Sequence, residues 1–228
     1  MLEIIAVTLK DAIDIEQYGG DRIELVTGIE VGGLTPSIGL IEKVCNTVDI
    51  PVNVMVRPHA KSFVYDKYDE EVILRDIEEI KKTKAYGIVF GALTCEGEID
   101  EALLKKVIHA KEHLSLTFHR AIDESNDVMK SLKTLLKYDI DRILTSGGKP
   151  KVTDAVDVIK EMIQESKNKI IILPGSGLYL DNVDRFIQDA KPMEIHMGSG
   201  VKYNKNNNEN ISKEAIREVQ TYLKGHKL

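Results

Sequence analysis

Eight short apolar runs, rich in valine and isoleucine, recur along the 228-residue chain and constrain its fold more than any other feature. They begin 20, 30, 35, 27, 28, 28 and 24 residues apart. Runs this dense in apolar residues are typical of strands covered on both faces, as the strands of parallel sheets are. The runs occupy residues 2–7, 22–26, 52–56, 87–91, 114–118, 142–146, 170–173 and 194–198.

Segments with the helical spacing of apolar residues separate these runs. Thr35 followed by Pro36 has the pattern of an N-cap with proline at the first helical position. Further helix starts are predicted at Asp69, Asp100, Asn126, Thr153, Asp181 and Ser212. Alternating strands and helices with right-handed crossovers predict an α/β fold, a TIM-type (β/α)8 barrel forming one domain over residues 1–228. Within it, residues 203–228 are expected to form a polar loop and a C-terminal helix.

An open doubly wound sheet is the alternative interpretation of the same alternation. Such a sheet usually carries a glycine-rich dinucleotide or phosphate fingerprint after its first strand. The corresponding turn here, "VTLKDA" at residues 7–12, contains no glycine. This difference favours the closed barrel.

Composition and charge limit the classes of partner. A net charge of -6 at pH 7 and a pI of about 5.6 disfavour nucleic acid, because duplex-binding proteins are usually basic. No run approaches the roughly 20 apolar residues that span a bilayer, and the N-terminal segment lacks the pattern of a signal peptide. Two isolated cysteines, Cys45 and Cys95, are too few for a disulfide framework. We therefore expect a cytoplasmic protein without nucleic-acid or membrane partners.

Polar residues follow the third and fifth apolar runs, where a barrel of this kind places its active site. Arg57 follows the third run, and His119, Arg120 and Asp123 follow the fifth. Arg57, His119 and Asp123 are predicted catalytic residues, and Arg120 is a predicted ligand-binding residue. Arginine can hold an anionic group, and a carboxylate such as Asp123 can fix the tautomer of His119. The competing role for Asp123 is that of a turn residue near the next helix.

Glycine- and serine-containing turns follow the last three runs. Backbone amides in such turns can bind a phosphate or another anion, although turns of this composition are also ordinary connections. The predicted ligand-binding residues of this kind are Ser146, Gly147, Gly175, Ser176, Gly177, Gly198 and Ser199.

Two glutamates and a histidine lie inside the apolar runs: Glu3, Glu24 and His196. Because a buried unpaired carboxylate is costly, inward-facing glutamates are expected to pair with Arg57, Arg120 or a protonated histidine. Glu24 and His196 are predicted catalytic residues and Glu3 a ligand-binding residue. A structural ion pair or an outward orientation is the alternative for either glutamate.

Several motifs are similar to those of the CutC family, whose members are often called copper homeostasis proteins. They are "VGGLTPS" (31–37), "VRP" (56–58), "VFGALT" (89–94), "TFHRAID" (117–123), "RILTSGG" (142–148) and "PGSG" (174–177). The resemblance extends from Leu2 to about His196. It implies a TIM-type barrel, a cytosolic location, a homo-oligomer such as a dimer or tetramer, and a link to copper tolerance.

The family's proposed copper ligands are cysteines in the first two strands, and both are replaced in this chain. Ile5 and Val26 stand at the matching positions of "EII" and "ELV". Because Cu(I) favours soft sulfur ligands, these replacements remove most of such a site. No metal ligand and no cofactor are predicted, and copper is implied by the resemblance alone.

The sequence favours an enzyme that carries out metal-independent proton transfer on a small anionic or sugar-like molecule, of the lyase or isomerase type. Glu24 or His119 would act as the base, while Arg57 and Arg120 would hold an anionic group or an enolate. Two alternatives stay open: a non-catalytic copper-binding or copper-tolerance protein, and a barrel that serves only as an interaction scaffold.

Overall fold

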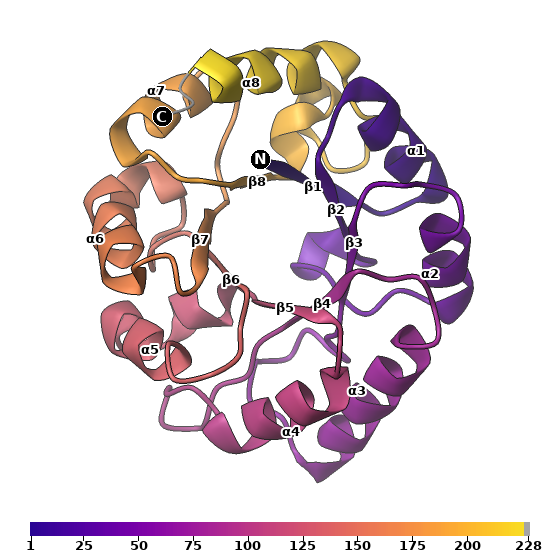
Figure 1. Ribbon diagram of the computed structural model, residues 1–228, viewed down its shortest axis with the longest axis vertical. Helices are drawn as coiled ribbons and strands as arrows, with labels where there is room; N and C mark the ends of the chain where they lie inside the picture. The colour runs from indigo at the N-terminus through magenta and orange to yellow at the C-terminus, as the bar shows by residue number, and fades with distance from the viewer. Residues whose placement is uncertain (226–228) are drawn as a thin grey trace.

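The computed structural model describes residues 1–225, in which eight parallel strands form a ring and eight helices surround it (Figure 1). This arrangement confirms the predicted TIM-type (β/α)8 fold. The end of the predicted C-terminal segment, residues 226–228, lies outside the described residues. Across residues 1–225, no helix combines the length and the apolar character required to cross a membrane.

Seven of the strands lie within the predicted apolar runs, and the seventh strand along the chain extends one residue beyond its run, to Pro174. The strands are β1 (Leu2–Ala6), β2 (Arg22–Leu25), β3 (Val52–Met55), β4 (Gly87–Phe90), β5 (Ser115–Phe118), β6 (Arg142–Thr145), β7 (Ile171–Pro174) and β8 (Ile195–Met197). Backbone ladders connect them in the order β7-β6-β5-β4-β3-β2-β1-β8. Within residues 1–225 no ladder joins β7 to β8, and we call this position the seam of the barrel.

Seven of the eight helices, all but the first along the chain, begin within three residues of the predicted starts. The eight helices are α1 (Leu9–Tyr18), α2 (Ile38–Cys45), α3 (Lys67–Ile80), α4 (Glu101–Lys111), α5 (Val128–Leu135), α6 (Val156–Ser166), α7 (Val183–Ala190) and α8 (Lys213–Gly225). Asp100 caps α4 as predicted. The prediction of Thr35 as an N-cap was wrong, because Ser37 caps α2 and the Thr35 hydroxyl accepts a hydrogen bond from Arg57 N. The sequence analysis gave no start for α1.

Side chains that point into the barrel change from polar to apolar along the strands. Successive strand residues face opposite sides, so every second residue of a strand points inward. The lower inward positions hold Glu3, Glu24, Asn53, Ser115, Arg142 and His196, all buried. The next inward-facing position towards the carboxyl end is apolar on five strands. We call these five residues the apolar belt: Ile5, Val26, Met55, Val89 and Leu144. The interior is therefore polar at the amino ends of the strands and apolar above them.

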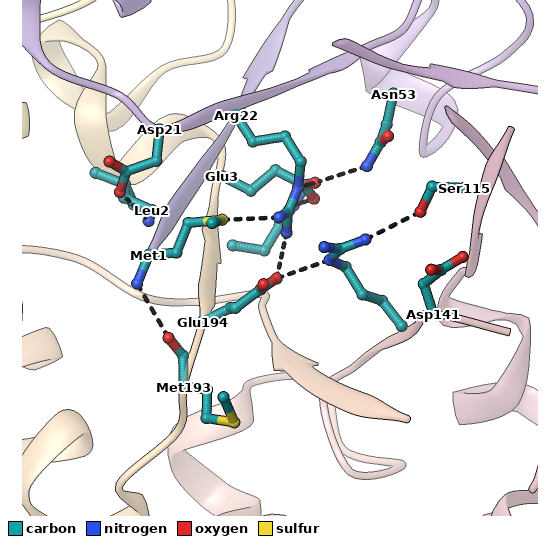
Figure 2. A network of polar contacts seen from close by, with 12 residues as sticks. Met1, Leu2, Glu3, Asp21, Arg22, Asn53, Ser115, Asp141, Met193 and Glu194 are labelled. Atoms are coloured by element: carbon teal, nitrogen blue, oxygen red, sulfur yellow. Dashed lines mark hydrogen bonds and ion pairs between the residues drawn. The ribbon is translucent and has the colours of Figure 1, made fainter. Parts of the chain in front are cut away.

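A buried ionic network closes the amino end of the barrel (Figure 2). Arg22 donates from Nε to Glu3 at 2.5 Å and from Nη2 to Glu194, and Arg142 donates to the same Glu194 carboxylate at 2.9 Å. Two guanidinium groups thus balance two carboxylates. The prediction of the partners of Glu3 was partly right. A histidine, His196, does pair with Glu3, but the guanidinium partner is Arg22 and not Arg57 or Arg120. Arg22 reaches Glu3 because the two residues are paired in register across β1 and β2.

Removing Arg22 is expected to destabilise the protein strongly. Arg22→Met leaves Glu3 and Glu194 with less neutralising charge, and breaking a buried pair typically costs about 3–5 kcal/mol. The matched control is Arg75→Met, which removes an exposed guanidinium whose ion pairs are worth about 0–1 kcal/mol. The free energy of unfolding, measured in urea, tests this expectation. Equal losses in the two variants would contradict it.

Candidate active site

A cavity of about 410 Å³ opens at the carboxyl ends of the strands. It is lined by residues that are far apart in the sequence and come from β1, β2, β3, β5, β6, β7 and β8 or from the loops that follow them. Of the predicted site residues, the cavity brings together Glu24, Arg57, His119, Arg120, Asp123, Ser176, Gly177, His196, Gly198 and Ser199.

Four predicted site residues do not line the cavity. Glu3 is fully buried and takes hydrogen bonds from Arg22 and Asn53 in the ionic network. The Ser146 hydroxyl is hydrogen-bonded to Asp123 and to the Lys149 carbonyl group, and the Gly147 N–H donates to the Thr145 hydroxyl. Gly175 lies at the seam, where a Cβ on it would be 3.1 Å from His196 Cβ. These four residues therefore support neighbouring groups rather than face a ligand.

Glu24 and His196 form a buried pair at the floor of the cavity. His196 Nε2 lies 3.6 Å from Glu24 Oε2, and His196 Nδ1 lies 2.9 Å from Glu3 Oε1. The ionised Glu3 carboxylate can only accept, so Nδ1 is assigned a hydrogen and Nε2 faces Glu24. Glu24 Oε1 is buried and has no hydrogen-bond partner. One oxygen of this carboxylate is therefore available to a ligand.

The environment shifts the titration of both members of this pair. Burial raises the pKa of Glu24 to about 7, with the Glu3 carboxylate adding to the rise and His196 opposing it. Burial lowers the pKa of His196, but Glu24 and Glu3 outweigh this effect and the net pKa is above its usual value. Burial also raises the pKa of Glu3, yet Arg22 and His196 bring it to about 2. Glu3 is thus a fixed anion, while the protonation states of Glu24 and His196 depend on each other.

His119 differs from His196 because it is held in the neutral form. Its Nδ1 accepts a hydrogen bond of 3.2 Å from Ala121 N, which assigns the ring hydrogen to Nε2. Burial and the nearby positive charge of Arg57 lower the pKa of His119 to about 3. Its Nε2 is buried without a partner. His119 is therefore neutral, with an Nε2–H group that can donate a hydrogen bond.

The prediction that Asp123 orients His119 was wrong, and its competing role as a turn residue is the observed one. A 3-10 helix that starts directly after His119 turns Asp123 towards the loop after β6. There its carboxylate accepts hydrogen bonds from the Thr145 hydroxyl at 2.5 Å and from Ser146 N and Gly148 N. Asp123 also pairs with Arg120 Nε at 2.9 Å. It joins the ends of β5 and β6 and holds Arg120 at the mouth.

The "VGGLTPS" segment anchors Arg57. Arg57 Nη1 donates to the carbonyl oxygens of Val31 at 2.9 Å and Gly33 at 3.2 Å. Gly32 and Gly33 both have a φ of +90°, a conformation that side chains rarely adopt. The segment can therefore present two carbonyl groups to one guanidinium, while Arg57 Nε is buried without a partner.

Two further residues shape the site and were missed by the sequence analysis. Gly91 makes room for an imidazole, since a Cβ there would lie 2.5 Å from His119 Nδ1. Phe63 packs with its ring centre 4.5 Å from Arg57 Cζ and 4.9 Å from the ring centre of His119. Gly91 belongs to the quoted "VFGALT" motif, so a glycine at a strand end was the available signal. Phe63 lies in a loop and gave none.

Glu3, Glu24 and His196 are close enough to be considered as metal ligands, with one ligand atom from each lying within 4.8 Å of the others. Glu3, however, already binds Arg22, Asn53 and His196 Nδ1. One imidazole nitrogen and one carboxylate remain, fewer than the three or four protein ligands of typical zinc sites. The ionic network therefore leaves this trio short of the ligands of a typical zinc site.

Fold and site together define a (β/α)8-barrel protein with a buried acid–base pair beneath guanidinium groups at its mouth. A sequence profile of the CutC family matches residues 1–201. This chain belongs to the CutC family.

Individual relatives agree with this assignment. The chain is 37% identical over 209 residues to the human copper homeostasis protein cutC homolog, covering 89% of this chain and 77% of the relative. The crystal structure of CutC from Streptococcus agalactiae superposes with a TM-score of 0.82 and 28% identity over 87% of this chain and 97% of that one. Phosphoribosyl anthranilate isomerase from Thermococcus kodakaraensis has a TM-score of 0.63 at 18% identity, covering 97% of both chains, and shares the fold alone.

Gly91→Ala is expected to displace His119. The added Cβ would force the imidazole away from Ala121 N, and overpacking of this kind typically costs about 1–3 kcal/mol. Gly39→Ala is the matched control, because no atom lies within 4 Å of its added Cβ and alanine favours the helix. Thermal unfolding and the ring-nitrogen NMR signals of His119 report the two effects. An unchanged His119 spectrum in the Gly91 variant would refute this role for Gly91.

Stability is expected to depend on pH through Glu24. Its pKa is about 7 when folded and about 4.5 in its ordinary state, so the folded protein binds more protons between these values. The wild type therefore loses stability relative to Glu24→Gln as the pH rises from 4.5 through 7. His196, whose pKa Glu24 raises, acts in the same direction. Urea unfolding of both proteins at a series of pH values measures the difference, and parallel curves would contradict the shift.

Proposed function

We propose that the cavity binds a small organic anion and catalyses metal-independent proton transfer on it, in an isomerase- or lyase-type reaction. One observation carries the proposal: Glu24 Oε1, Arg57 Nε and His119 Nε2 are buried without partners and belong to side chains that line one cavity. Buried polar groups are normally hydrogen-bonded, so three such atoms around one space favour a ligand that supplies the missing bonds.

The floor pair provides a base and an acid side by side. Ionised Glu24 takes a proton from a carbon next to a carbonyl group, and the electrons of that C–H bond form the C=C bond of an enol. Protonated His196 donates its Nε2 hydrogen to the carbonyl oxygen, so no net charge develops on the substrate. Glu3 stays ionised and keeps the Nδ1 hydrogen of His196 in place. A base with a pKa near 7 is well matched to this chemistry at neutral pH.

The upper wall of the cavity supplies positive charge and a neutral donor. Arg57 is held rigidly by two carbonyl groups, and Arg120, with 42% of its side chain exposed, lies at the mouth. His119 Nε2 adds a hydrogen bond without adding charge. These groups support binding of a carboxylate or phosphate, because guanidinium groups match the geometry of both anions.

Copper is suggested by the names of the relatives, but the donors of this cavity are not those that Cu(I) prefers. Ile5 lines the cavity and Val26 packs in an apolar cluster with Met55 and Val89, so neither family cysteine position offers sulfur. Cys45 and Cys95 do not line the cavity. The thioethers of Met55 and Met197 line it, but both residues are buried in apolar clusters. Soft thiolate coordination therefore has no place in this site.

Deuterium exchange tests the proton transfer. In D2O the wild type is expected to replace hydrogen by deuterium at the carbons next to the ketone of small oxo acids. The loss of the proton NMR signal of these positions measures the rate. Glu24→Gln and His196→Gln are expected to slow exchange by about 10²-fold or more, because each removes a proton-transfer group. Glu42→Gln, an exposed carboxylate on α2, is the control. Equal exchange rates in wild type and Glu24→Gln would refute the assignment.

A Cu(I) titration against a competing chelator examines the alternative. Tight stoichiometric binding that disappears in Cys45→Ser, Cys95→Ser would overturn the proposed function in favour of copper binding.

A further inference from the structure

The cavity has two polar levels separated by the apolar belt, and this spacing constrains what can fill it. Resting on the proposed proton transfer, we infer that the substrate is an elongated oxo acid. Its anionic end is held at the upper level, its ketone reaches the floor, and an apolar spacer joins them.

The upper level is fixed above the ends of the strands. Arg57 donates to carbonyl groups of Val31 and Gly33, which belong to the loop between β2 and α2. Phe63 packs against both Arg57 and His119, so the guanidinium and the imidazole share one side of the cavity. This side holds positive charge and two unpartnered N–H groups, Arg57 Nε and His119 Nε2.

The floor lies within the strands. Glu24 is paired in register with Ile5 on β1 and with Asn53 on β3, and Arg57 follows Asn53 by four residues. At about 3.3 Å per residue, this places the Cα of Arg57 roughly 13 Å further along the strand direction than that of Glu24. The Arg57 guanidinium stays at the level of the loop to which it is bonded, and Gly33 of that loop lies against the apolar belt, where a Cβ on it would be 3.4 Å from Val26 Cβ and Met55 Cε. From this offset we expect a three-carbon acid to engage one level at a time.

On β2 and β3 the apolar belt lies between the two levels, because Val26 follows Glu24 by two residues and Met55 precedes Arg57 by two. Ile5, Met55 and Leu144 line the cavity, and Val26 and Val89 pack against Met55. Thr117 lies at the same level on β5 but does not line the cavity. A charged or hydroxylated segment at this level would lose hydration and find few partners, whereas a chain of methylene groups fits. The spacer is therefore a hydrocarbon segment.

A chain-length series tests this inference with defined probes: pyruvate, 4-oxopentanoate, 5-oxohexanoate, 6-oxoheptanoate and the uncharged 5-oxohexanoamide. Ligand-observed NMR measures the affinity of each probe. The rate at which the hydrogens next to the ketone exchange in D2O measures proton transfer. We expect 5-oxohexanoate or 6-oxoheptanoate to bind at least about tenfold more tightly than pyruvate and the amide. One charge-assisted hydrogen bond accounts for a difference in affinity of this size. We expect exchange to follow the same order.

Two variants locate the levels. Arg57→Lys keeps the positive charge but loses the paired N–H donors of the guanidinium, and we expect it to reduce the preference for 5-oxohexanoate over its amide. The control, Arg75→Lys on the surface of α3, is expected to leave this preference unchanged. Ile5→Asn places an amide in the belt and is expected to weaken binding of the longer acids more than that of pyruvate. Ile5→Val is its control.

The outcomes separate the two proposals. Pyruvate binding and exchanging as well as the longer acids would overturn the elongated substrate while the proton transfer stands. Selective, Arg57-dependent binding of the longer acids without exchange in the wild type would support the two-level cavity and refute the proton transfer. Equal affinity for 5-oxohexanoate and its amide would overturn the inference outright.

Discussion

The pairing of Arg22 with Glu3 and Glu194 is the interaction on which the interior of this barrel depends. A small barrel is normally filled by aliphatic side chains, and isolated charges there would be too costly to keep. Here two guanidinium groups and two carboxylates neutralise one another at the amino end. Because Arg22 keeps Glu3 ionised, Glu3 can orient His196, and His196 in turn faces Glu24. The arrangement of Glu24 and His196 therefore depends on the ionic network.

The motifs of the CutC family have a common physical role in this chain, which is to fix the groups that face the cavity. The glycines of "VGGLTPS" present carbonyl groups to Arg57, and Gly91 of "VFGALT" leaves space for the ring of His119. Asp123 of "TFHRAID" and the backbone of "TSGG" bind each other across β5 and β6. Most conspicuous motif residues are thus anchors, and few are free to meet a ligand.

The fold could be predicted from the sequence because its signal is repeated eight times and each strand is buried on both faces. Arg57 and His119 could be predicted to meet at one cavity because they follow strand ends, and Glu24 and His196 could be added because they are polar residues inside apolar runs. Partner choice could not be predicted in this way. Whether Glu3 meets Arg22 or Arg57 depends on register between strands, and the direction of Asp123 depends on the 3-10 helix after His119. Neither leaves a periodic pattern in the sequence.

The seam between β7 and β8 has a mechanical consequence for the floor of the cavity. His196 lies on β8, but the groups that position it, Glu3 and Glu24, lie on β1 and β2, which are joined to β8 by continuous backbone ladders. These three strands form one continuous hydrogen-bonded segment that carries Glu3, Glu24 and His196. At the seam itself, within residues 1–225, His196 meets only side-chain packing, against Gly175, so the ladders on the β1 side set the distances among the three groups.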